Sequence, residues 1–124
     1  MALDKTNGSQ AYLCGRLFAV LEKLQQEASS FKLNRTIKDA YFASASMNPA
    51  MVFPKLIRLS QHHLKKSKYP MYYSKLIEEI VDGLNGEFPK ILLLIDQGRF
   101  DIGYYHQCND FWKSKEKSEN KEEE

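Results

Sequence analysis

The stretch SQAYLCGRLFAVLEKLQQEA, residues 9–28, decides the fold class. Ser9 is a suitable N-cap residue, because its hydroxyl oxygen can accept a hydrogen bond from an N–H of a first helical turn. The apolar residues that follow recur at steps of three and four, which places them on one face of a helix: Leu13, Leu17, Phe18, Leu21, Leu24 and Ala28. We therefore predict a helix that begins beside Ser9 and buries one face.

The rest of the chain shows the same helical periodicity. We predict helices over about 34–46, from Asn48-Pro49 to about 66, from Tyr69-Pro70 to Asn85-Gly86, and from about 96 onward. Proline suits a first helical turn, where its missing N–H costs little. Residues 91–95 have the composition of a strand, but no second strand is available to pair with them. The residues expected to face the core are Ile37, Ala40, Tyr41 and Ser44 in the second helix, Phe53, Leu56, Ile57, Ser60 and Leu64 in the third, Tyr73, Leu76, Ile77, Ile80, Val81 and Leu84 in the fourth, and Phe100, Tyr104, Cys108 and Phe111 in the last.

The sequence therefore predicts an all-α protein with a single bundle of about five helices. A chain of 124 residues has room for one core, and we place this domain at residues 1–112. Residues 113–124, KSKEKSENKEEE, contain no apolar side chain, so we expect a charged, disordered tail. We expect neither a membrane span nor a secretion signal, because no apolar run approaches the roughly 20 residues of a membrane helix. Cys14 and Cys108 lack any motif spacing and suggest reduced thiols in a cytoplasmic protein, with a disulfide between them as the alternative.

The charges are segregated along the chain although the net charge is only +2. Residues 32–75 hold nine basic side chains and one acidic side chain, a balance of +8, whereas residues 76–112 hold two basic and seven acidic ones, a balance of −5. Such segregation favours a basic surface for a polyanion and a separate acidic surface. A random solvated surface is the alternative.

The adjacent residues His62 and His63 could bind a metal ion or transfer a proton. Successive residues of a helix point about 100° apart, so the two rings are poorly placed to bind one ion, and no HExxH motif or nearby ligand completes a metal site. We expect His62 to lie in a basic stripe of the third helix and His63 to pack at the border of its apolar face. The predicted nucleic-acid contacts are Arg35, Lys38, Lys55, Arg58, His62, Lys65, Lys66 and Lys68.

Other catalytic or cofactor sites find little support. There is no glycine-rich phosphate loop and no GxSxG, so we predict no catalytic residue, no metal and no cofactor. Glu78, Glu79 and Asp82 suit acid–base work or magnesium binding, but a solvated helix face explains them better. GYYHQCNDFW, residues 103–112, is aromatic enough to stack on bases. Tyr104, Cys108 and Phe111 fit a core stripe at helical spacing, which leaves Tyr105 and Trp112 open.

Three long segments then resemble a known family: MALDKTNGSQAYLCGRLFAVLEKLQ (1–25), LNRTIKDAYFASASMNPAMVFPKLIRLSQHHL (33–64) and FPKILLLIDQGRFDIGYYHQCNDFW (88–112). They are similar to the C-terminal region of the large subunit of type I-C CRISPR surveillance complexes, or Cascade. The large subunit is several times longer, so a chain that starts at a methionine within this region resembles the small subunit made by internal translation of the same gene.

The resemblance implies a non-enzymatic helical subunit of Cascade that acts in antiviral defence in the cytoplasm. The partners it implies are the large subunit, the backbone subunits, another copy of the chain, the guide RNA and both target and non-target DNA, with no membrane and no small-molecule substrate. The residues predict sequence-independent backbone contacts, because lysine dominates the third helix. Stabilisation of the R-loop is therefore the expected function. The alternative is a structural spacer that bridges subunits and contacts little nucleic acid.

Overall fold

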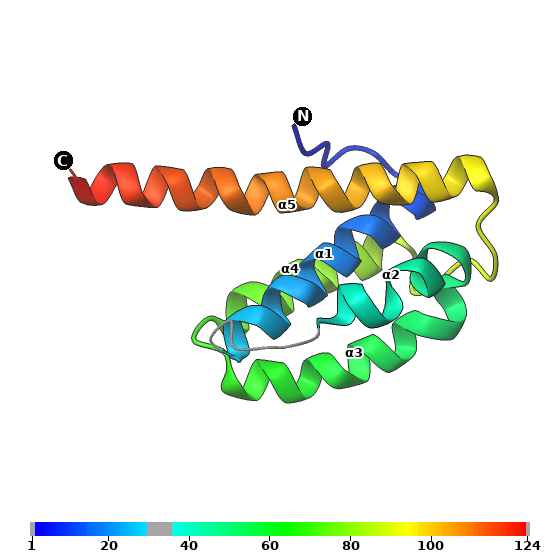
Figure 1. Ribbon diagram of the computed structural model, residues 1–124, viewed down its shortest axis with the longest axis horizontal. Helices are drawn as coiled ribbons and strands as arrows, with labels where there is room; N and C mark the ends of the chain where they lie inside the picture. The colour runs from blue at the N-terminus through cyan, green and yellow to red at the C-terminus, as the bar shows by residue number, and fades with distance from the viewer. Residues whose placement is uncertain (1, 30–35, 124) are drawn as a thin grey trace.

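Five helices make up the structure. The computed structural model describes the backbone of residues 2–29 and 36–123, and the side chains of those residues up to Lys113. The helices are α1 (Gln10–Ala28), α2 (Ile37–Met47), α3 (Pro49–Lys66), α4 (Pro70–Gly83) and α5 (Leu94–Glu123), as Figure 1 shows. The described ranges contain no strand, so the predicted all-α bundle is confirmed.

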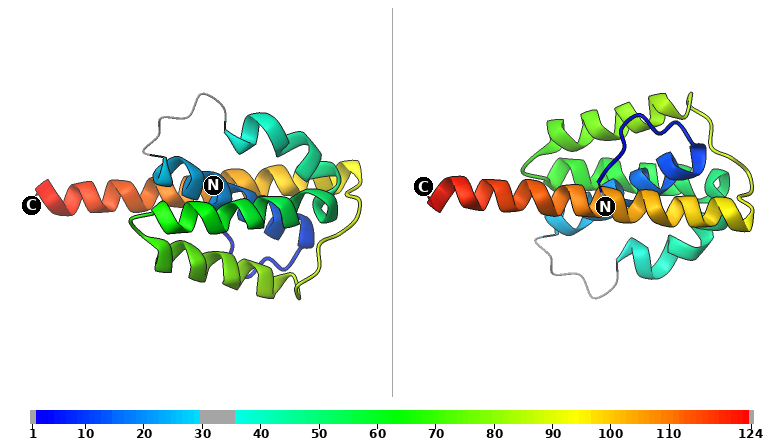
Figure 2. Two further views of the ribbon diagram at one scale, coloured as in Figure 1. Left: turned by 90° about the horizontal axis from the view of Figure 1, so that it is seen from below. Right: turned by 90° about the horizontal axis from the view of Figure 1, so that it is seen from above.

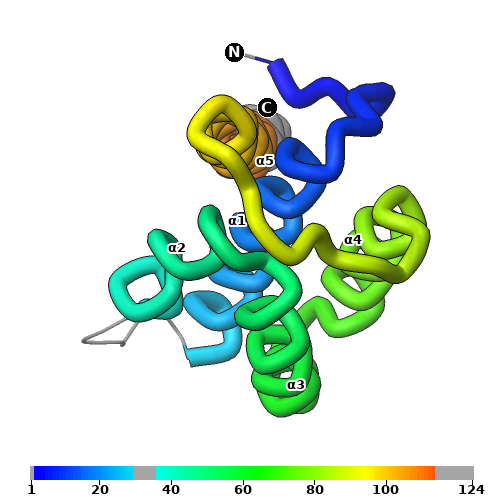
Figure 3. Tube along the Cα trace, turned by 90° about the vertical axis from the view of Figure 1, so that its right-hand side faces the viewer, coloured from blue at the N-terminus to red at the C-terminus, as the bar shows by residue number. Residues whose placement is uncertain are grey.

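Helix α1 forms the centre of the bundle. Helix α5 runs along one side of it and α2, α3 and α4 surround the rest (Figures 2 and 3). Ser9 is its N-cap, as predicted, and accepts a hydrogen bond from the Tyr12 N–H at 3.5 Å. Every residue from 11 to 22 is buried, so this part of the helix is covered all round and not on one face only. A helix that is enclosed in this way needs apolar or internally paired side chains on every side.

Two glycines allow α1 and α5 to cross closely. A Cβ atom on Gly15 would lie 2.0 Å from the Phe100 carbonyl oxygen, and one on Gly103 would lie 2.2 Å from the Tyr12 carbonyl oxygen. Since these neighbours are backbone atoms of a packed helix, they cannot move aside as a flexible side chain would. The contact between the two helices therefore requires glycine at both positions.

The buried face of α2 differs from the prediction. Thr36 and Asp39 form a capping box that starts the helix at Ile37, whereas the predicted start at Asn34 lies outside the described residues. Ala40 and Ser44 are exposed, which corrects the prediction that they face the core. The reason is the neighbouring aromatic residue: Phe42 turns inward and makes edge contacts with Phe18 and Phe100, each with 5.4 Å between ring centroids. The buried residues of α2 are Ile37, Ala45 and Ser46.

The boundaries of α3 and α4 agree with the sequence analysis. Both begin with proline in the first turn, and α3 ends at Lys66. Glu27 of α1 holds the turn between α3 and α4, because its carboxylate accepts hydrogen bonds from the Ser67 hydroxyl and from the Lys68 N–H. Asn85 and Gly86, both with positive φ (58° and 74°), end α4.

The segment that returns from α4 to α5 is irregular and leaves apolar side chains exposed. The Leu92 N–H donates to the Met47 carbonyl oxygen at 2.9 Å, and the Ala50 N–H donates to the Pro89 carbonyl oxygen at 3.0 Å. These bonds hold the segment against the junction of α2 and α3. Leu92 is buried, but the other apolar residues around it are not.

Helix α5 continues well beyond the core. Its backbone is helical to Glu123, although residues 113–123 contain no apolar side chain that would hold a helix against the bundle. The division into a domain of 1–112 and a tail of 113–124 stays a prediction. Within the described residues, no helix has the length and apolar content that crossing a membrane requires.

Candidate nucleic-acid interface

The outer side of α3 carries a row of cationic side chains. Phe53, Leu56 and Ser60 point into the bundle and are buried, which turns the opposite side of the helix to solvent. We call that side the cationic face of α3, and its exposed members are Lys55, Arg58, His62, Lys65 and Lys66. Lys68, which follows the helix, is also exposed. The predicted amphipathic pattern of this helix is therefore confirmed in the structure.

No acidic side chain offsets this face from within the helix. Residues 49–66 contain no aspartate or glutamate. Within the described ranges, no member of this face forms an ion pair, and the pair between Arg99 and Asp96, at 2.7 Å, lies on α5. Cations without an ion-pair partner retain their attraction for an external anion, because none of it is spent on a neighbouring carboxylate.

Some of these cationic side chains also stabilise the fold of the protein. Lys65 and Lys66 occupy the last turn of α3, where a positive charge interacts favourably with the helix dipole. The Nζ atom of Lys55 lies 5.7 Å from the ring centroid of Tyr41 on α2, which steadies its side chain against the neighbouring helix. Both roles leave the ammonium groups open to solvent.

Lys38 is not part of this face. It lies on α2 and is half-buried, and its Nζ atom lies 4.9 Å from the ring centroid of Tyr104, 5.4 Å from that of Tyr105 and 5.6 Å from that of Phe42. These rings belong to α5 and α2, and α5 lies across the bundle from α3 (Figure 3). The structure therefore separates Lys38 from the other predicted contacts. Arg35 lies outside the described residues.

The two histidines point in different directions, as predicted. Their ring centroids are 6.0 Å apart and their planes are inclined by 63°. His62 is exposed, whereas His63 is half-buried and its Nε2 atom has no hydrogen-bond partner among the described residues. Burial lowers the pKa of His63, and the nearby His62 and Lys66 lower this pKa further. A mostly neutral packing residue is the role that this environment supports.

The remaining candidates lie on other helices. Glu78, Glu79 and Asp82 are exposed on α4, as expected for a solvated face. The described part of the chain contains no group of three histidine, cysteine or acidic side chains arranged to hold a metal ion. Tyr104 is buried in the core stripe of α5, whereas Tyr105 and Trp112 are exposed.

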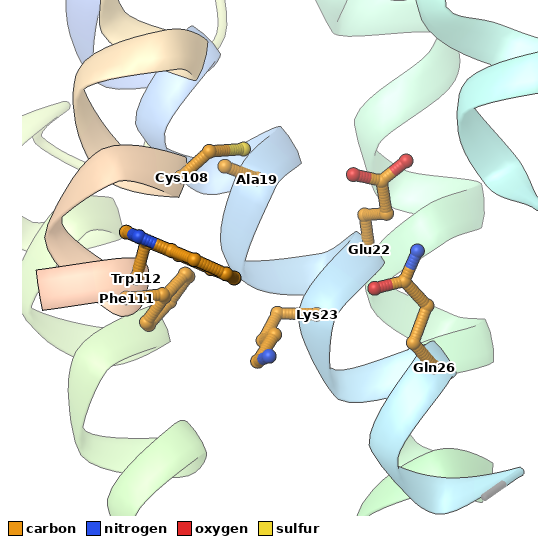
Figure 4. Close-up of a pocket in the computed structure, with 7 residues that line it drawn as sticks. All are labelled: Ala19, Glu22, Lys23, Gln26, Cys108, Phe111 and Trp112. Carbon is orange, nitrogen blue, oxygen red and sulfur yellow. The ribbon is translucent and has the colours of Figure 1, made fainter. Parts of the chain in front are cut away.

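A cavity of about 310 Å³ between α1 and α5 was not predicted. Figure 4 shows Glu22, Lys23 and Gln26 of α1 on one side and Trp112 of α5 on the other. Glu22 is buried, and its Oε1 accepts a hydrogen bond of 2.5 Å from the Tyr104 hydroxyl. Burial raises the pKa of the Glu22 carboxyl. A charged residue inside the apolar stripe of 9–28 was the available signal, but its partner is 82 residues away in the sequence.

A second buried polar pair was also missed. Arg16 is almost fully buried and donates from Nε to the Gln107 side-chain oxygen at 3.0 Å. Burial lowers the pKa of Arg16, while Glu79, Tyr12 and Asp110 act in the opposite direction. Arg16 joins α1 to α5 inside the bundle, so it is a structural residue and does not belong to the cationic surface.

These features define a class: an all-α, single-bundle protein whose candidate site is an exposed cationic helix face. A family model described as CRISPR-associated protein (Cas_Csd1) matches residues 1–112. The chain therefore belongs to the Cas_Csd1 family, which confirms the predicted relationship to type I-C CRISPR proteins. No curated protein matches the sequence.

Proposed function

We propose that this chain is a non-catalytic small subunit of a type I-C Cascade complex that binds nucleic-acid backbone through the cationic face of α3. Membership of a CRISPR-associated family supports the setting. The observation that carries the proposal is the row of exposed cations on one helix that has no acidic residue. The subunit would act in the cytoplasm beside the large subunit, the backbone subunits and another copy of itself.

The spacing of the row suits phosphates. Lys55 and Lys66 are eleven residues apart, or roughly 16 Å at the helical rise. One strand of B-form DNA presents about five phosphates over that distance. Lysine contacts phosphate oxygens without reading sequence, and only Arg58 and Gln61 on the outer side of α3 have the donor geometry for reading bases. Backbone tracking is therefore the better supported mode.

Backbone contacts suffice for the proposed role in the R-loop. In RNA-guided targeting, base pairing reads the sequence, and the exchange of a DNA duplex for an RNA–DNA hybrid is nearly balanced in free energy. A protein that holds the hybrid or the displaced strand by a few charge contacts shifts this balance. The bound strand would be the displaced non-target DNA or the guide–target hybrid.

The test replaces four members of the cationic face by glutamine, which preserves helix propensity: Lys55, Arg58, Lys65 and Lys66. We expect weaker R-loop formation in complexes assembled with this variant. For the isolated chain and single-stranded DNA, we expect the slope of log affinity against log salt to become shallower by about 3, since each contact contributes about 0.7.

A matched control removes the same charge elsewhere, at the exposed residues Lys5, Lys75, Lys90 and Lys113. It should leave target affinity and salt slope close to those of the wild type. If both variants weaken binding equally, only net charge matters and the proposed face is wrong. If neither changes binding, the backbone-binding function is wrong.

A second candidate function, a structural spacer between subunits, is favoured by exposed apolar side chains at one end of the bundle. Leu94 is 84% exposed and Met51 is 79% exposed, and the hydrogen bond between Leu92 and Met47 holds their two segments together. We call this group the apolar patch; its members are Met47, Met51, Ile91, Leu93, Leu94 and Ile95. Several exposed apolar side chains on neighbouring segments are typical of protein–protein contacts.

Changing Leu94 and Ile95 to lysine separates the two functions. If the chain is a spacer, this variant should be lost from assembled complexes, while the four-residue glutamine variant should assemble and bind target normally. If the chain binds nucleic acid, the patch variant should still bind single-stranded DNA in isolation with the salt slope of the wild type.

A further inference from the structure

The cavity between α1 and α5 combines an aromatic wall with a polar edge. Trp112 is 59% exposed and borders the cavity, while Phe111 and Ala19 supply apolar surface beside it. Figure 4 shows the Trp112 ring on the α5 side, with Glu22 and Gln26 on the α1 side. A large exposed aromatic ring that borders a cavity can stack against a planar group of a ligand. The aromatic rings of the closed core cannot, because other side chains cover them.

The polar edge offers both kinds of hydrogen-bonding group. The Gln26 amide donates and accepts. The Glu22 carboxyl, already oriented by the Tyr104 hydroxyl, adds oxygen acceptors beneath the surface. Lys23 adds a cation to the lining. A nucleotide has the matching parts, because its base has a flat face and an edge of donors and acceptors, and its phosphate is an anion.

An apolar side chain from a protein partner fits this lining less well. It would cover the Glu22 carboxyl and the Gln26 amide without offering them hydrogen bonds, and polar groups that are buried in this way destabilise a complex. A nucleobase covers the same groups and can pair with them. The composition of the cavity therefore favours a base.

We propose that this cavity binds one unstacked base of single-stranded nucleic acid, with the face of the base against Trp112. The inference rests on the proposed nucleic-acid function and adds to it a base-binding site on the side of the bundle that α1 and α5 form. Because stacking uses a face that every base has, the site would tolerate any sequence.

The test uses the fact that Trp112 is the only tryptophan in the chain, so its fluorescence reports on this cavity. The full chain is titrated with an oligothymidine and with an abasic oligonucleotide of the same length and charge. We expect the oligothymidine to quench the fluorescence and the abasic strand to leave it unchanged. Trp112→Ala should weaken oligothymidine binding about tenfold and leave binding of the abasic strand unchanged, while Trp112→Phe should restore part of the affinity.

Two controls keep the outcomes distinct. Tyr69→Ala removes an exposed aromatic residue outside the cavity and should not alter either titration; thermal unfolding shows whether each variant is folded. If the wild type and Trp112→Ala bind the oligothymidine with the same affinity, and each binds the abasic strand equally well, the inference is overturned and the proposed function stays intact. Loss of Trp112→Ala from assembled complexes with unchanged oligonucleotide binding would identify a protein-docking site and also overturn it. If the wild type binds neither strand, the proposed function fails as well.

Discussion

The ammonium group of Lys38 on α2 lies 4.9 Å from the ring centroid of Tyr104 on α5. The same ring donates its hydroxyl hydrogen bond to Glu22 on α1, so three helices meet at this point. A cation that is held against aromatic faces stabilises the fold. Lys38, which the sequence assigned to nucleic-acid binding, is thus placed among packing residues.

We predict that Lys38→Gln lowers the free energy of unfolding by about 1–2 kcal/mol and hardly changes the salt slope of single-stranded DNA binding. Lys66→Gln, at an exposed position of the cationic face, should do the reverse: its effect on stability should stay within about 0.5 kcal/mol, and its slope should be shallower by about 0.7. Urea unfolding and a salt series measure the two quantities. If Lys38→Gln is as stable as the wild type and its binding to single-stranded DNA has a shallower salt slope, Lys38 contacts nucleic acid and this prediction is wrong.

The close crossing of α1 and α5 predicts that alanine destabilises the protein at two glycines in the crossing and not at a third glycine outside it. Gly15→Ala and Gly103→Ala should each destabilise the protein by about 3 kcal/mol, because the added carbon meets backbone atoms at 2.0 Å and 2.2 Å. Gly98→Ala is the control: it lies in α5 with nothing within 4 Å of the added carbon, and should stabilise by up to about 1 kcal/mol through helix propensity. Chemical denaturation of the three variants measures these changes. Similar stabilities for all three would show that the two helices are not in such close contact.

The burial of Glu22 predicts a pH dependence of stability. Burial raises the pKa of this carboxyl in the folded state above its ordinary value of 4.5, so folding favours the protonated form. The corresponding stability is present below pH 4.5 and is lost as the pH rises through the folded-state pKa. Glu22→Gln cannot ionise and should lack this loss, so the difference in unfolding free energy between variant and wild type should shift in favour of the variant as the pH rises from 4 to 7. A difference that is constant with pH would show that Glu22 is not desolvated.

The two thiols should differ in reactivity. Burial raises the pKa of both thiols, to about 12 for Cys14, but Cys14 is fully buried whereas Cys108 is only half-buried. Since the thiolate is the reactive form, we expect a disulfide-exchange reagent at pH 8 to modify Cys108 first and Cys14 only as fast as the protein unfolds. Cys108→Ala should therefore show one slow reaction, which urea accelerates. A fast reaction of Cys14 in that variant would contradict its enclosure.

The thiol of Cys14 also predicts loss of stability in alkali. Its ordinary pKa is 9.0 and its folded-state pKa is about 12, so the folded state holds the proton over a range in which the unfolded chain loses it. Stability should fall as the pH rises above 9. Cys14→Ala should show a shallower decline of melting temperature above pH 9 than the wild type.

The sequence by itself determined where α1, α3 and α4 begin and which side of α3 is cationic. Ser9 acts through a capping hydrogen bond, and Pro49 and Pro70 act through the fixed geometry of proline in a first helical turn. These signals lie within one turn and need no knowledge of distant residues. The two faces of α3 follow in the same way, because one face packs on the core and the spacing of residues along a single helix settles the other.

Only the tertiary structure decided which helix lies at the centre and what each helix meets. The enclosure of α1 depends on the four helices that pack around it. The inward position of the Phe42 ring depends on Phe18 and Phe100, and the position of the Lys38 ammonium group depends on the Tyr104 ring. The cavity beside Trp112 lies between two helices that are far apart in sequence and that cross at Gly15 and Gly103. Contacts of this kind are set by which surfaces fit together in space, and periodicity along one helix contains no information about the surface that will cover it.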